Sequence, residues 1–269
     1  FDVTDNKAPK QLWNFEFDDR SQIIESRAYR GKLYIVSATF IDPSSCVVPL
    51  SKSTPIVNIN CTEIFHPTNT VPVDATYTVI IMDANTGVIE KKTSFLASNS
   101  TSIIYMSEQN IYVTYNFYED LIKFYYSFYK EAGSGIISGD ALDKLKTVAD
   151  LTISSQAKMT EFSVIMQAYQ NSLTNDERLK IETETQNKLS DYSKNHIREL
   201  EQTGIVKIGS SNLDVQATGT VPGRLLNQFS LDEYKGSLRI ATTIGNNFFA
   251  SSESVNDVYI LDSSLKLTG

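Results

Sequence analysis

The stretch VQATGTVPGRLLNQFSLDEYKGSLRIATT, residues 215–243, decides the fold that we expect for this chain. An alternating, strand-like run stops at the tripeptide VPG, residues 221–223, and a short apolar connector follows it. The chain then turns at Lys235 and Gly236 and restarts as the alternating run LRIA. A strand, a crossing segment and a tight turn in this order are typical of a β protein whose sheets follow one another along the chain.

The apolar residues of this stretch predict how it packs. One face of the strand before VPG is expected to carry an alternating set, Leu213, Val215 and Ala217. The crossing is expected to be packed by Leu225, Leu226 and Phe229. The next arm of a sheet is expected to begin with Leu238 and Ile240.

Composition indicates a globular protein without a nucleic-acid partner. Of 269 residues, 41% are hydrophobic and 21% are charged, so the chain can bury a core as one large all-β domain or as two ordinary domains. The net charge is -8 and the longest basic run is Lys91-Lys92, so no basic stripe offers phosphates a binding surface. No window approaches the roughly 18 uncharged apolar residues of a membrane span. The chain opens at Phe1 without a basic leader, which predicts a mature or truncated form.

Two strand patterns recur and alternate along the chain. In the first, a turn precedes an alternating strand, at residues 30–36, 108–114 and 235–241. In the second, an apolar strand ends at an aspartate that begins a turn, at Asp2, Asp83 and Asp262. The first pattern predicts the second arm of a hairpin, and the two patterns together predict stacked four-stranded units.

Two insertions interrupt these repeats. Residues 40–75 hold both cysteines and several prolines, which predicts an irregular loop. Residues 118–201 change from a period of two to about 3.6, the period of a helix. Within them, residues 159–173 predict an amphipathic helix, and Thr174 with Glu177 forms the pattern of a capping box that opens a long polar helix. Two shorter helices are expected upstream.

The cysteines suggest an oxidising compartment. Cys46 and Cys61 lie in one irregular segment with no third thiol to compete, so we expect a disulfide between them, with two unpaired thiols as the alternative. Glycosylation sequons begin at Asn60 and Asn99. Because a chain this rich in Asn, Ser and Thr contains sequons by chance, they are informative only if the disulfide forms.

Several motifs together resemble a known family. They are VPGRLLNQFSLDEYKGSLRIATT, DVYILD at 257–262, FDVTDNKAPKQL at 1–12, ESRAYRGKLYIV at 25–36 and SIIYMSEQNIYVTY at 102–115. These motifs resemble a family of secreted archaeal and bacterial β-propeller domains, distantly related to WD-repeat propellers, whose members tend to carry a charged helical insertion before VPG. The resemblance implies a propeller fold and a secreted or cell-surface location, and the family carries no catalytic motif to transfer.

The expected fold is mainly β: a partial β-propeller of about three to four four-stranded antiparallel blades, with an inserted helical subdomain. We expect blades at residues 1–117, the helical insertion at 118–201, and a further blade or blades at 202–269. Closed propellers generally have about four to eight blades. Further blades, from the same chain or from another, are therefore expected to complete this one.

The sequence offers no convergent catalytic, cofactor-binding or metal-binding residues. His66 and His196 are isolated, and no cysteine and histidine spacing suits zinc. Asp83 begins DANTG, which echoes a calcium loop but lacks the acid at the twelfth position, so a hairpin turn is the preferred interpretation. Asp232 and Glu233 are neighbours, and neighbours on a strand point in opposite directions.

Aromatic residues cluster where the helical insertion begins. The cluster comprises Tyr118, Phe124, Tyr125, Tyr126, Phe128 and Tyr129. An exposed row of rings could bind carbohydrate or a partner protein, whereas a buried row would dock the helices on the propeller. We favour docking, although helical spacing cannot place all of these rings on one face.

Three functions remain open at this point. The first is an extracellular or cell-surface scaffold or binding module without enzymatic activity, with a protein or carbohydrate partner and no cofactor. The second is a hydrolase or lyase acting on polysaccharide, with Asp83, Asp232 and Glu233 at the propeller mouth. The third is a structural protein that assembles through open sheet edges.

Overall fold

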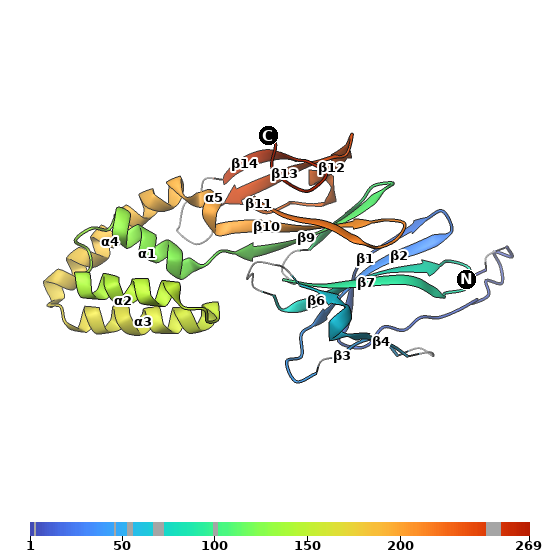
Figure 1. Cartoon of the computed structure of the whole chain (residues 1–269), viewed down its shortest axis with the longest axis horizontal. Helices are drawn as coiled ribbons and strands as arrows, with labels where there is room; N and C mark the ends of the chain where they lie inside the picture. The colour runs from blue at the N-terminus through green and yellow to red at the C-terminus, as the bar shows by residue number, and fades with distance from the viewer. Residues whose placement is uncertain (3, 46, 53–55, 67–72, 99–101, 246–253) are drawn as a thin grey trace.

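Three antiparallel sheets lie one above another, and a helical arm extends from one end of the stack (Figure 1). The computed structural model describes residues 1–269 except 3, 46, 53–55, 67–72, 99–101 and 246–253. The first sheet has the order β1-β2-β6-β7-β5, the second β11-β10-β9-β8 and the third β12-β13-β14, while β3 and β4 form a separate ribbon.

The bounds of the elements follow the chain. The strands of the first sheet are β1 (Ser21–Tyr29), β2 (Lys32–Phe40), β6 (Ala75–Asp83), β7 (Ile89–Ala97) and the short β5 (Ile64–Phe65). Those of the second are β8 (Ile103–Met106), β9 (Asn110–Tyr118), β10 (Glu201–Gly209) and β11 (Val215–Pro222), and those of the third are β12 (Leu231–Tyr234), β13 (Ser237–Gly245) and β14 (Ser254–Leu261). The ribbon is β3 (Val47–Ser51) and β4 (Val57–Asn60). The helices are α1 (Leu121–Glu131), α2 (Gly139–Asp150), α3 (Ser155–Asn171), α4 (Asn175–Asn195) and α5 (Ile197–Leu200), with short 3-10 turns η1 (Cys61–Glu63) and η2 (Gln228–Ser230).

A tight hairpin opens each sheet, which confirms the predicted second arms β2, β9 and β13. Arg30 and Gly31 turn the first hairpin with φ of 49° and 75°, and Lys235 and Gly236 turn the third with φ of 51° and 79°. Two successive left-handed residues are the signature of a type I′ turn, whose twist matches that of the strands. Glycine supplies the second position of each turn without steric cost.

Both insertions leave the sheets at the same kind of connection. The pairing of β2 with β6 ends at Phe40 and Ala75, and the pairing of β9 with β10 ends at Tyr118 and Glu201. Each insertion therefore joins the second strand of a meander to the third, at the end opposite the hairpins. The helical arm accordingly extends away from the hairpin ends (Figure 1).

The second sheet is buried on both faces because its strands alternate. Ile111 and Val113 of β9 pack against the first sheet, where Tyr77 and Val79 meet them in one core cluster. Tyr112, between them in sequence, points to the opposite face and joins the core of the third sheet. Side chains that point to opposite faces at successive positions thus build two cores from one strand.

The VPG tripeptide carries the chain from the second sheet to the third. Gly223 has φ of 85°, and a Cβ built there would lie 2.7 Å from Ile244 Cγ1 and 2.9 Å from Thr242 Oγ1. The Thr242 hydroxyl donates to the Pro222 carbonyl at 2.8 Å. Arg224 N donates to Thr243 O at 3.0 Å and accepts the return bond at 2.8 Å, so the crossing begins as a paired extension of β13.

The predicted packing of the crossing is only partly correct. Leu225 is buried, as are Leu238 and Ile240. Leu226 and Phe229 do not pack the crossing, because they are 69% and 86% exposed. The pairing of Arg224 with Thr243 fixes the side of the connector that faces the core, and only one side chain of the connector can point inward there.

The helical insertion has a core of its own. Asp120, Ser138 and Ser154 cap α1, α2 and α3, and the predicted capping box of Thr174 and Glu177 is confirmed at α4. The rings of Phe124, Phe128 and Tyr129 lie in a cluster of helical residues that also contains Leu145 and Tyr192. The prediction that the aromatic cluster docks the helices on the sheets is therefore wrong, since these rings join the helices to one another. Tyr118, at the end of β9, is 41% exposed.

The excursion at residues 40–75 is more regular than its prolines predicted. β3 and β4 pair in an antiparallel ribbon in which Pro49 stands beside a register shift, a position where a missing N–H is tolerated. Leu50 and Ile59 of the ribbon are fully buried against Ile80 and Met82 of β6. The ribbon thus covers the face of the first sheet that points away from the second sheet.

Candidate functional site

The hairpin ends of the sheets surround a groove of about 590 Å³. We call it the hairpin groove and define it by the residues of three sheets that line it: Arg27 and Tyr29 near the end of β1, Tyr105 and Glu108 near the end of β8, and Phe229 and Asp232 in η2 and β12. β1, β8 and β12 are edge strands of their sheets. The groove therefore lies where three sheet edges converge, away from both insertions.

Polar contacts already order part of this lining. Arg27 Nη2 donates to Gln228 Oε1, which joins the first sheet to the segment before β12. Arg27 Nε also lies 3.8 Å from Glu25 Oε1. Asp232 Oδ2 accepts from Arg239 Nε at 2.8 Å across the β12–β13 pair. Both carboxylates are exposed or half-buried, so their ion pairs contribute little to stability.

Phe229 is the most exposed large apolar residue at the groove. Its side chain is 86% exposed, and its backbone N–H is held by Asn227 Oδ1 at 2.9 Å. The residue is therefore fixed in position by its backbone while its ring faces solvent. A large ring held exposed beside a groove is a typical element of a ligand site.

Glu233 joins the second sheet to the third. Its carboxylate accepts from Ser107 Oγ at 2.5 Å and from Asn110 Nδ2 at 2.9 and 3.1 Å. Its backbone N–H donates to Tyr105 OH at 3.1 Å. Burial, and then the nearby charge of Glu233, raises the pKa of the Tyr112 hydroxyl. The acid is thus occupied by donors from the neighbouring sheet.

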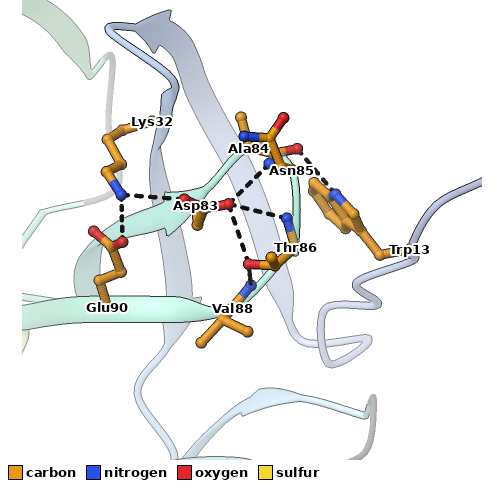
Figure 2. A network of polar contacts seen from close by, with 8 residues as sticks. All are labelled: Trp13, Lys32, Asp83, Ala84, Asn85, Thr86, Val88 and Glu90. Carbon is orange, nitrogen blue, oxygen red and sulfur yellow. Dashed lines mark hydrogen bonds and ion pairs between the residues drawn. The ribbon is translucent and has the colours of Figure 1, made fainter. Parts of the chain in front are cut away.

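Asp83 organises the turn between β6 and β7 (Figure 2). Its Oδ1 accepts from the backbone N–H groups of Asn85 and Thr86, both at 3.0 Å. Lys32 Nζ lies 3.2 Å from Asp83 Oδ2 and also contacts Glu90. Hydrogen bonding to Lys32, and then to the turn amides, holds the pKa of Asp83 below its usual value. The interpretation of DANTG as a hairpin turn is confirmed.

Trp13 covers this turn from outside (Figure 2). Its Nε1 donates to the Ala84 carbonyl at 3.0 Å. Gly87 has φ of 70°, and a Cβ there would lie 2.5 Å from Trp13 Cδ2. Glycine is therefore required at this position by both its backbone angle and the indole ring.

The predicted acids do not converge. Asp232 lines the hairpin groove, whereas Asp83 caps a turn of the first sheet and Glu233 serves the contact between the second and third sheets. His196 is also committed locally: its ring stacks on Tyr192 at 4.0 Å and its Nδ1 lies 2.8 Å from Glu199 Oε1. In the described part of the chain, no group of three or more His, Cys, Asp or Glu is placed to hold a metal ion.

The predicted modification residues are only partly described. Asn60 is exposed at the end of β4, and Cys61 directly follows it at the start of η1. Cys46 and Asn99 lie outside the described residues. The Cys46–Cys61 disulfide and the use of either sequon therefore stay predictions.

A second hollow, of about 900 Å³, lies between the helical insertion and the ends of the first and second sheets. At its wall, the buried Lys158 Nζ contacts Asp120 Oδ2 at 2.6 Å and the Ala149 carbonyl at 2.9 Å. One ammonium group thereby joins the start of α1, the end of α2 and the first turn of α3. We interpret these contacts as the joint of the helical arm.

Sequence reasoning did not find the hairpin groove. Of its lining, only Asp232 was considered as an acid, and Phe229 was expected in the core. Arg27, Tyr105 and Phe229 belong to three sheets, and no spacing in the sequence shows that they meet. The turns at Gly31 and Gly236 were the available signal, since they mark which end of the sheets carries the hairpins.

Comparisons with known proteins agree with this architecture. The chain is 40% identical over 262 residues to an uncharacterised protein of Archaeoglobus fulgidus, covering 97% of this chain and 40% of the relative. It is 30% identical over 272 residues to the uncharacterised protein MJ1554 of Methanocaldococcus jannaschii, covering 100% of this chain and 42% of that relative. The chain thus spans about two fifths of the length of these curated relatives. No solved structure matches it significantly.

The family and the fold can now be stated together. None of the helices in the described part of the chain combines the length and apolar character of a membrane span. The sheets are mainly antiparallel meanders, as propeller blades are. The sequence profile of the family described as "Beta propeller domain" matches residues 1–269. The chain therefore belongs to the β-propeller domain family.

Proposed function

We propose that this chain is a binding module without enzymatic activity, in which the sheets form a rigid scaffold and the hairpin groove receives a ligand. The observation that carries the proposal is that edge strands of three sheets converge on one groove beside an exposed, backbone-anchored ring, Phe229. Buried cores on both sides of the second sheet keep these strands in place. A site built on strands is positioned more accurately than one built on mobile loops.

We further propose that each of the three sheets is one blade and that more blades complete the array. Ala241, Val258 and Ile260 lie on the outer face of the third sheet, and Val258 and Ile260 are 68% and 41% exposed. Exposed apolar residues that share a sheet face favour a packing partner. The greater length of the curated relatives supports a further blade as that partner.

The two other functions receive less support. A hydrolase or lyase needs two carboxyl groups on either side of the scissile bond, and of the three suspected acids only Asp232 lines the groove. Assembly through open sheet edges would use outer strands such as β11 or β14. Light scattering tests assembly directly, because a mass that stays monomeric at all concentrations contradicts it.

An extracellular or cell-surface location is proposed on the family resemblance and the predicted disulfide. Non-reducing peptide mapping of protein from its natural source is expected to yield a Cys46–Cys61 peptide pair. The same digest is expected to show whether Asn60 carries a glycan. Two free thiols in that digest would remove the main support for this location.

Ligand-observed nuclear magnetic resonance with a diverse fragment library tests the binding function. The library should contain sugars, dipeptides and nucleosides, and each hit should be repeated with Phe229→Ala and Arg27→Ala. We expect hits that both variants weaken. Hits that neither variant affects, or turnover of a substrate that Asp232→Asn abolishes, would contradict the proposal.

A further inference from the structure

The lining of the hairpin groove is balanced in charge. Arg27 brings one positive group, Glu108 one negative group, and Asp232 is paired with Arg239. An anionic ligand would meet the two carboxylates, and a cationic ligand would meet the guanidinium group. A neutral ligand meets no such repulsion.

The same lining separates donors from acceptors. The Arg27 guanidinium can only donate hydrogen bonds, whereas the carboxylates of Glu108 and Asp232 can only accept them. A hydroxyl group both donates and accepts, so one hydroxyl can bridge such groups with charge-assisted bonds. A ligand with several neighbouring hydroxyl groups therefore suits this lining best.

Phe229 adds an apolar platform that the other exposed rings do not offer. The ring of Tyr234 carries Lys235 Nζ at 5.2 Å and the Arg239 guanidinium at 4.8 Å. No described ring or cation stacks on Phe229, which is 86% exposed. Its face is thus available to the C–H face of a sugar ring, an apolar surface on an otherwise polar molecule.

We propose that the hairpin groove binds a neutral oligosaccharide, with Phe229 stacking on one sugar ring and Arg27 and Asp232 bonding its hydroxyl groups. The inference rests on the proposed binding function and names its ligand class. The groove volume of about 590 Å³ lies within the range of small-ligand sites. A peptide would instead pair with a free strand edge along several residues. The groove takes its lining from separate short segments, so it is less suited to that mode.

Calorimetric titration tests the ligand class. The probes are four neutral hexasaccharides (of α-glucose, β-glucose, N-acetylglucosamine and mannose), an acidic hexagalacturonate, and acidic and basic octapeptides. We expect at least one neutral probe to bind, and Phe229→Ala to weaken its affinity at least tenfold. The matched control is Phe40→Ala, because Phe40 is also exposed, at 60%, but lies at the opposite end of the first sheet. It should change the affinity less than twofold.

Salt dependence provides a second readout. The affinity for a neutral probe should change less than about twofold between 0.05 and 0.5 M NaCl, because screening acts on charged ligands. Binding of only the peptides or the galacturonate, with loss in Phe229→Ala, would overturn the sugar assignment and leave the binding function standing. A neutral probe weakened equally by Phe229→Ala and Phe40→Ala would overturn the assignment of this groove. If no titration probe and no library fragment binds, both proposals fail.

Discussion

Gly223→Ala should weaken the crossing between the second and third sheets. The left-handed φ of 85° costs an alanine roughly 1–2 kcal/mol. The added Cβ would also lie 2.7 Å from Ile244 Cγ1, and overpacking of this kind costs about 1–3 kcal/mol. The expected loss is therefore about 2–5 kcal/mol, a large part of the usual stability of a domain.

Gly236→Ala is the matched control for this prediction. Gly236 has a similar φ of 79°, but a Cβ there meets nothing within 4 Å. The control therefore carries the backbone strain without the contact. The two variants share the same change in the unfolded chain, so the difference between them isolates the packing cost.

Hydrogen exchange at Thr243 measures the result. Its N–H donates to the Arg224 carbonyl at 2.8 Å, directly after the VPG tripeptide. A contact cost of about 1–3 kcal/mol predicts a protection factor about 5 to 150 times lower in Gly223→Ala than in the control. Equal protection in the two variants would refute the role that we assign to VPG.

Three further predictions concern contacts between elements. Gly87→Ala should push the Trp13 ring off its turn, because the new Cβ would lie 2.5 Å from the indole, and the fluorescence of this single tryptophan should shift to longer wavelength. Glu233→Gln should cost about 1–3 kcal/mol in urea unfolding, since the donors on Ser107 and Asn110 lose a charged acceptor; an unchanged midpoint would contradict the clamp. Hydrogen bonding to Arg198 lowers the pKa of Asp257, so this contact stabilises the fold above the usual carboxylate pKa and is lost as pH falls through the lowered value. Amide exchange in α5 should therefore accelerate below about pH 4, and it should not do so in Asp257→Asn.

Local turns were the most predictable part of the structure. Gly31 and Gly236 announce type I′ hairpins, and Thr174 with Glu177 announces the start of α4. Each of these features is decided by a few neighbouring residues. Their conformations therefore follow from short-range sterics and hydrogen bonds, which the sequence states directly.

Features that depend on distant contacts were not predictable. Leu213 was expected on a strand, yet it occupies a turn with φ of 61° and is buried between the first and second sheets. A leucine rarely adopts this backbone conformation, and the strain is tolerated because the side chain fills the core. Phe229 was expected inside and lies outside, because the pairing of Arg224 turns only Leu225 inward. Tertiary packing decided each outcome.

The candidate site depends on distant contacts throughout. Arg27 and Gln228 meet across the groove although 201 positions separate them. The sequence predicted the hairpins that form the groove, but only the stacking of the sheets brings their ends together. The helical insertion, which is the more conspicuous feature of the sequence, emerges at the other end.

Hydrogen exchange of the whole chain, with and without the tightest-binding probe, tests the central claim most directly. If the hairpin groove is the binding site, protection should rise in the ends of β1 and β8 and in η2 and β12. Exchange in α1 to α4 should stay unchanged. Protection confined to the helical insertion, or to the outer face of β13 and β14, would contradict the account.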